Sequence, residues 1–162
     1  WTAEREADTH TITPVIADHL KSRHYSFHWI PFFGAQGTEN WKELRFTKAF
    51  LQPNYFFSPE PIDGRLDAAC RIASSLGMGM EIEFDERVLK SSSDCRDDRL
   101  KLYMAKFREY GTWFAKDIAY YIGSHALNSM FESTDANDRK LYLDFCRFVS
   151  TRQENSLHPT AE

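Results

Sequence analysis

Several features that would identify a protein class are missing from this sequence of 162 residues. No apolar run approaches the ~20 residues that a membrane-spanning helix needs, so we expect no membrane partner. Basic patches are absent and the net charge is −4, which argues against nucleic acid as a partner because phosphate binding needs positive charge. The cysteines are few and scattered, without the spacing of a disulfide framework or a zinc site: Cys70, Cys95 and Cys146.

Four catalytic signatures are missing as well. The chain has no GxSxG nucleophile elbow, no Walker phosphate loop, no GxGxxG turn and no HExxH pair. It also has no internal repeat and no low-complexity segment. Nothing in the sequence therefore supports a serine hydrolase, a nucleotide-binding protein or a zinc peptidase, and we expect no cofactor.

What is present is typical of one globular domain. Hydrophobic residues make up 42% of the chain and charged residues 27%, and the length suits a single core. Aromatic residues, at 15%, gather in two runs, "HYSFHWIPFF" at 24–33 and "FLQPNYFF" at 50–57. Such runs indicate either a large aromatic core or a groove for a ligand with apolar faces, and the sequence leaves both interpretations open.

Helical and strand patterns alternate along the chain, which is typical of βαβ units with a parallel sheet. Thr13 is the predicted N-cap of the first helix, with Pro14 in the first helical position. Gly77 is the predicted stop of the third. The predicted helices cover 13–22, 39–46, 64–77, 98–111, 125–133 and 137–149. The predicted strands, parallel and covered by helices, are 25–32, 49–56, 78–84 and 118–123.

The strand within "GMGMEIEFDER" (77–87) is unusual because Glu81, Glu83 and Asp85 alternate along it, although acids are depleted in strands. In a doubly wound sheet, these acids would lie beside the crevice at the carboxyl edge. In a (β/α)8 barrel they would climb the inner wall toward the rim where ligands bind. The barrel explains all three acids together, so we favour it.

Four segments of this chain, in this order, resemble the bacterial domain-of-unknown-function 4855 family (DUF4855). They are "FHWIPFFGAQGTENWKELRFTKAFLQPNYFF", "GMGMEIEFDERV", "YYIG" and "DRKLYLDFCRFV". The resemblance covers nearly the whole chain and implies a (β/α)8 barrel of the TIM type, similar to glycoside hydrolases. It brings no assigned activity.

The full domain of that family is about twice as long as this chain. The resemblance therefore implies that residues 1–150 form the C-terminal half of the barrel, about four or five βα units with C-terminal helices. "WTAERE" (1–6) would be the fourth strand, and residues 151–162 a flexible tail. A half-barrel leaves open sheet edges, which favour self-association.

Retaining hydrolases of this barrel type carry an acid/base Glu after the fourth strand and a nucleophilic Glu at the end of the seventh. By that analogy of fold, Glu4 and either Glu81 or Glu83 are the candidate catalytic residues. Stacked acids in a low-dielectric barrel push their pKa values apart, and one protonated and one ionised carboxyl is what glycoside hydrolysis requires. Glu4 is equally well explained as an ordinary solvated acid.

The residues predicted to contact a sugar are aromatic or polar side chains expected near one rim of the sheet: Trp29, Gln52, Asn54, Tyr55, Asp85 and Trp113. Gln52 and Asn54 are expected on the same side of one strand. Flat apolar rings beside amides suit a pyranose, whereas a phosphate would need a Gly-rich loop or an arginine cluster. Core packing for the aromatic residues and loop anchoring for the amides remain as alternatives.

Other roles for the acids also remain open. Glu81, Glu83 and Asp85 are candidates for ion pairs with basic residues of the missing half. A divalent metal on these acids and His28 is a further possibility, since carboxylates suit Mg²⁺ or Ca²⁺. No spacing motif supports a metal, and His28 also fits a core histidine.

Two functions therefore follow. The first is a glycoside hydrolase or a related carbohydrate-active domain that works with paired carboxylates. The second is a carbohydrate-binding or scaffold barrel without catalysis. A carbohydrate partner favours an extracellular or periplasmic location, although the sequence itself does not fix one.

Overall fold

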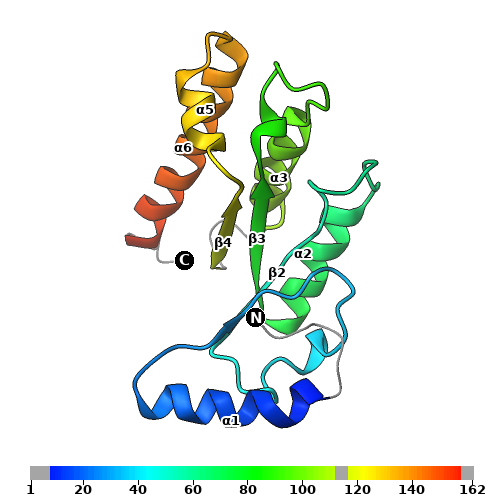
Figure 1. Cartoon of the computed structure of the whole chain (residues 1–162), viewed down its shortest axis with the longest axis vertical. Coiled ribbons are helices and arrows are strands. Elements are labelled where there is room, and N and C mark those ends of the chain that lie inside the picture. The colour runs from blue at the N-terminus through cyan, green and yellow to red at the C-terminus, as the bar shows by residue number, and fades with distance from the viewer. Residues whose placement is uncertain (1–7, 112–116, 158–162) are drawn as a thin grey trace.

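The computed structural model describes residues 8–111 and 117–157, and its centre is a parallel sheet of four strands (Figure 1). The strands pair in chain order, each parallel to the next, and form a half-barrel sheet. Their bounds are β1 His28–Trp29, β2 Lys48–Leu51, β3 Gly79–Phe84 and β4 Ile118–Ile122. The predicted parallel arrangement is thus confirmed.

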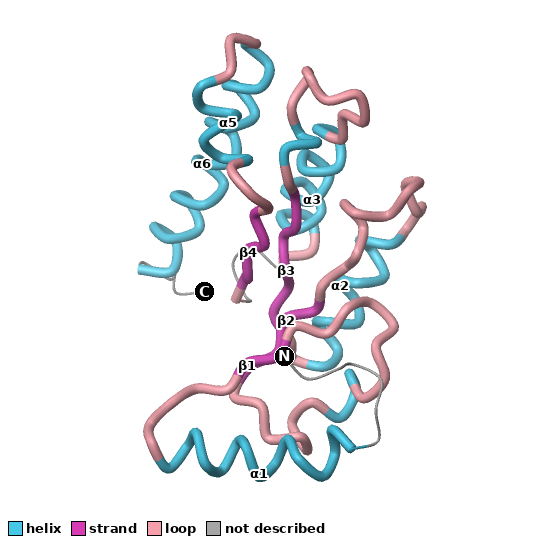
Figure 2. Tube along the Cα trace, in the orientation of Figure 1, coloured by secondary structure: helices cyan, strands magenta, loops and turns pink. Residues whose placement is uncertain are grey.

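One α-helix follows each of β2 and β3, and two follow β4; together these helices cover one side of the sheet, while the first helix lies across its lower end (Figures 1 and 2). Among the described residues, no helix is both long and apolar enough to cross a membrane. The α-helices are α1 Asp8–Ser22, α2 Arg65–Leu76, α3 Asp97–Glu109, α5 Ala126–Glu132 and α6 Ala136–Leu157. The short 3₁₀ helices are η1 Thr38–Asn40 and η2 Glu86–Val88.

Two strands are shorter than predicted. β1 has two residues, and β2 ends at Leu51 rather than near residue 56. Proline follows closely in both cases, Pro31 after β1 and Pro53 after β2, and it cannot donate to a sheet ladder. Irregular pairing continues for a few residues, since the Gln52 amide donates to the Pro31 carbonyl at 2.8 Å.

The first helix begins earlier than predicted. α1 starts at Asp8, so the interpretation of Thr13 as an N-cap and Pro14 as the first helical residue was wrong. Pro14 lies inside the helix, where it removes one backbone hydrogen bond, and the fully buried Thr13 lies in the same turn. The segment predicted as a helix at 39–46 contains only η1 and turns. α6 continues to Leu157, into the segment predicted as a tail.

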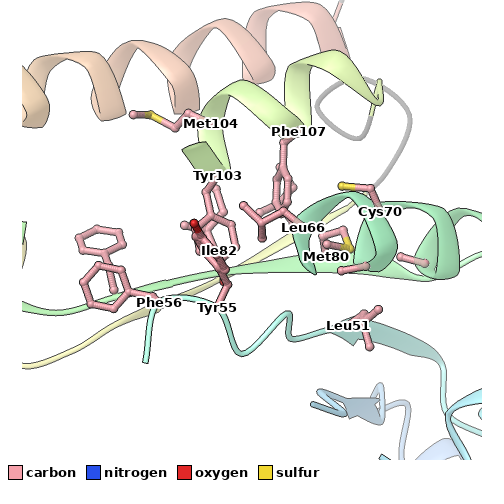
Figure 3. Packing of buried hydrophobic residues seen from close by; sticks show 14 of the residues in the cluster. Leu51, Tyr55, Phe56, Leu66, Cys70, Met80, Ile82, Tyr103, Met104 and Phe107 are labelled. Carbon is pink, nitrogen blue, oxygen red and sulfur yellow. The ribbon is translucent and has the colours of Figure 1, made fainter. Parts of the chain in front are cut away.

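The stripes predicted on α2 and α3 form the core. Leu66, Ala69, Cys70 and Ala73 are buried on α2, and Gly77 ends that helix in the left-handed conformation. On α3 the buried stripe is Leu100, Tyr103, Met104 and Phe107. Figure 3 shows Leu66, Cys70, Tyr103 and Phe107 of these stripes packed around Met80 and Ile82 of β3. Each fully buried apolar side chain contributes about 2 kcal/mol, so this packing fixes β3 firmly.

Gly79, the first residue of β3, allows this strand to lie close to Phe50 of β2 and to Asp117, the residue before β4. A Cβ atom at this position would lie 2.5 Å from the Asp117 carbonyl oxygen and 2.7 Å from a ring carbon of Phe50. Both contacts are shorter than real Cβ atoms make, so a side chain here would push β2 or β4 away from β3. The second glycine of "GMGM", Gly79, is thus explained by close packing.

Candidate functional site

The acids of β3 lie on the face of the sheet opposite the helices. Phe84 packs edge-on against Phe145 of α6 at 5.2 Å, so the even-numbered residues of β3 face the helical layer. Alternation then places Glu81 and Glu83 on the inner face of the half-barrel. Tyr121 of β4 is in register with Glu83 and shares that face.

Glu81 is buried, with 4% of its surface exposed. Burial and, to a smaller extent, the neighbouring Glu83 raise the pKa of its carboxyl from the ordinary 4.5 to about 7. Its Oε2 atom has no hydrogen-bond partner among the described residues. Glu81 is therefore a carboxyl that retains a proton close to neutral pH.

Glu83 is completely buried, and one of its two carboxyl oxygens is hydrogen-bonded. Its Oε1 atom accepts hydrogen bonds from the backbone N–H groups of Tyr55, at 2.7 Å, and Phe56, at 3.1 Å. The Tyr103 hydroxyl donates to the same atom at 2.8 Å. Burial raises the pKa of Glu83, and these bonds together with the Gln52 side chain oppose that rise without cancelling it. Its Oε2 atom has no partner in the described part of the chain.

The loop that contacts Glu83 is also held from its other side. Arg96 and Arg99 are 6% and 5% exposed and donate to carbonyl groups of residues 55–59. The shortest of these bonds, from Arg96 to the Phe56 oxygen and from Arg99 to the Ser58 oxygen, are both 2.6 Å. Glu83 accepts from two N–H groups of this loop and the arginines donate to its carbonyl groups, so residues 55–59 are held from both sides.

Asp85 differs from the two glutamates because it forms an ion pair within this chain. Its carboxylate accepts from the Arg87 backbone at 2.9 Å and from the Arg87 guanidinium at 2.8 Å. Burial alone would raise the pKa of Asp85, but the bonds from Arg87 outweigh that effect and lower it. Asp85 is thus the ionised cap of η2 at the end of β3.

The residues predicted to contact a sugar do not lie together at one rim of the sheet. Trp29 is 8% exposed and stacks on Phe46 at 5.1 Å, on the helix-facing side, away from the glutamates. Tyr55 is 7% exposed, and its ring packs edge-on against Tyr103 at 5.9 Å. These two rings belong to the core, which is the alternative that the sequence left open.

The predicted pairing of Gln52 and Asn54 on one side of a strand was wrong. β2 ends before both residues, and Asn54 is exposed in the loop that follows, in the left-handed conformation with φ 50°. Asparagine tolerates that conformation better than most residues. Gln52 is half-buried and its side chain lies within hydrogen-bonding range of Glu83, so only one of the two amides reaches the acids.

Two predicted residues, Glu4 and Trp113, lie outside the described residues. His28 is exposed on β1, with its ring edge-on to Phe50 at 5.9 Å, and β2 separates its strand from β3. Among the residues that the structure describes, no three His, Cys, Asp or Glu side chains come together as metal ligands.

Five residues near the acids are not predicted from the sequence: Tyr121, Phe57, Arg87, Arg96 and Arg99. Phe57 packs edge-on against Tyr121 at 5.7 Å, and the Arg87 guanidinium lies 5.1 Å from the Phe57 ring. The pattern "IAYYIG" carried a usable signal, because a strand parallel to β3 must place one of its two tyrosines on the acidic face.

The fold and site define a mixed α/β protein with a parallel half-barrel sheet and two buried glutamates on its inner face. The chain belongs to the family described as Domain of unknown function (DUF4855), whose sequence model matches residues 1–147. No curated protein and no solved structure shows detectable similarity to it.

Proposed function

We propose that this chain is the C-terminal half of a (β/α)8 barrel and acts on neutral oligosaccharides through paired carboxyl groups. The order of parallel strands with helices on one side supports the barrel. The DUF4855 family carries no assigned activity, so the proposal depends on the residues of the inner face.

The observation that carries the proposal is the different environment of two glutamates two residues apart. Glu81 keeps its proton because burial raises its pKa to about 7, which suits a general acid that protonates the leaving oxygen of a glycosidic bond. Burial raises the pKa of Glu83 as well, but three hydrogen bonds to its Oε1 atom favour the ionised form and oppose that rise. Of the two glutamates, Glu83 is therefore the better candidate for the carboxylate that attacks the sugar or activates a water. Glu4 remains a further candidate acid.

The variant Glu81→Gln tests this role. It keeps the shape of the side chain and removes the proton that is donated, so we expect the rate of oligosaccharide hydrolysis to fall about a hundredfold. In the unchanged protein, activity should decline as the pH rises past about 7 and Glu81 loses its proton. Release of reducing ends from neutral oligosaccharides measures both effects.

The matched control is Glu43→Gln, because Glu43 is an exposed glutamate of the turn that follows η1. Its rate and pH profile should equal those of the unchanged protein. Unchanged turnover in both Glu81→Gln and Glu83→Gln would remove β3 from the chemistry.

One observation favours a second function, a carbohydrate-binding barrel without catalysis. Glu83 binds two backbone N–H groups of its own chain, which is a structural role that a binding domain would share. The two functions differ in the unchanged protein, because a binding domain retains neutral oligosaccharides without releasing reducing ends from them.

Open sheet edges lead to a separate expectation. Within the described residues, β1 and β4 each pair with only one neighbour. Unpaired edges attract other strands, so we expect the chain to form dimers whose sedimentation depends on concentration. Added salt should not dissociate them, because backbone hydrogen bonds are little affected by ionic screening. A monomer throughout the concentration range in sedimentation velocity would contradict this expectation.

A further inference from the structure

The inner face carries a large aromatic side chain that core packing does not bury. Tyr121 is 50% exposed, and its strand register places it beside Glu83. Phe57, from the loop that Glu83 holds, packs edge-on against it, with ring centroids 5.7 Å apart. Two rings from different strand ends thus form one aromatic surface at the rim, next to the paired glutamates.

The cation beside this surface is already neutralised. The Arg87 guanidinium lies 5.1 Å from the centre of the Phe57 ring and donates to the Asp85 carboxylate from Nε, at 3.0 Å and 3.1 Å, and from Nη2, at 2.8 Å. Asp94 adds a second acid at 3.9 Å. An anionic ligand would have to displace these carboxylates, so the surface favours an uncharged ligand.

We propose that Tyr121 and Phe57 form the platform on which a neutral sugar ring of the substrate stacks, beside Glu83. This inference rests on the proposed function and adds the binding surface to it. The apolar face of a pyranose covers the Tyr121 ring, and its hydroxyl groups remain available to the carboxyl groups of the inner face. Phe57 holds the tyrosine in place from the edge, and Arg87 packs against Phe57.

The experiment measures binding by calorimetry with the 162-residue chain. The probes are three neutral hexasaccharides, cellohexaose, xylohexaose and mannohexaose, with trigalacturonate as the anionic probe. Tyr121→Ala removes the ring and should weaken binding of the bound neutral hexasaccharide about tenfold. Tyr121→Phe keeps the ring and should bind as the unchanged protein does. Trigalacturonate should bind to none of the variants.

The matched control is Phe131→Ala. Phe131 is an aromatic residue of α5 that is 60% exposed and lies in the helical layer, so this variant should bind as the unchanged protein does. Thermal unfolding of Tyr121→Ala should match that of the unchanged protein, which separates lost stacking from lost folding.

The outcomes distinguish this inference from the proposed function. If the unchanged protein binds and hydrolyses no neutral hexasaccharide, the proposed function fails and the platform fails with it. If it binds one and Tyr121→Ala binds equally well, the platform is wrong while the proposed function stands. Preference for trigalacturonate would overturn the assignment of a neutral ligand.

Discussion

Replacing Glu83 by alanine is expected to lower the free energy of unfolding by about 4 kcal/mol. The change removes the acceptor for the N–H groups of Tyr55 and Phe56 and for the Tyr103 hydroxyl. Glu83 and Tyr103 are fully buried, so water does not replace the lost acceptor without disrupting the core. Urea unfolding followed by far-UV circular dichroism measures the difference.

Two further variants make this prediction specific. Glu83→Gln keeps an oxygen acceptor in nearly the same place and should lose only about 1 kcal/mol. Glu43→Ala removes an exposed glutamate and should change stability by less than about 0.5 kcal/mol. A loss below about 1 kcal/mol in Glu83→Ala would show that the loop does not depend on this carboxyl.

The stability of the protein is expected to fall as the pH rises from about 4.5 to about 7. In this range folded Glu81 holds a proton that the unfolded chain releases, because its pKa is raised from 4.5 to about 7 in the folded state. The contribution of Glu81 to the free energy of unfolding is complete below pH 4.5 and lost above pH 7. The difference between its pKa in the unfolded and folded states corresponds to roughly 3 kcal/mol. The raised pKa of Glu83 acts in the same direction.

Acids whose pKa values are lowered in the folded state make the protein less stable as the pH falls, and they do so at lower pH. Burial would raise the pKa of Asp97, yet bonds from Lys101 and Lys90 outweigh burial and lower it to about 2. Its contribution is lost only as the pH falls below about 4. Urea unfolding at a series of pH values should show the decline between 4.5 and 7, and Glu81→Gln should remove most of it. An equal decline in Glu81→Gln would mean that another group is responsible.

Local patterns in the sequence were enough to predict much of the fold. The stripes on α2 and α3 were correct because helical spacing alone decides which side chains share a face. The strand at 78–84 was correct for the same kind of reason, since alternation of acids and apolar residues fixes its two faces. Prediction from the sequence placed Glu81 and Glu83 together because both lie on this one element.

The remaining errors concern strand ends and contacts between distant segments. Trp29 was assigned to the ligand groove from its place near a strand end, but the side of the sheet it faces depends on the register with β2. Asn54 fits the alternation of a strand, but β2 ends at Leu51, and Pro53 cannot donate to a sheet ladder that would continue it. Arg96 and Arg99 bind a loop about 40 residues earlier, and no local pattern predicts that contact.

The segment 55–59 has no regular secondary structure, yet its opening has to break bonds on both sides at once. Glu83 accepts from the amides of Tyr55 and Phe56, and the buried Arg96 and Arg99 donate to carbonyl groups of the segment. The amide protons of Tyr55 and Phe56 should therefore exchange with solvent as slowly as those of the core strands. The next residues, 60–63, are exposed. The boundary between the held and the exposed parts of this loop thus falls near Pro59, so substitutions in residues 60–63 should leave the position of Phe57 against Tyr121 unchanged.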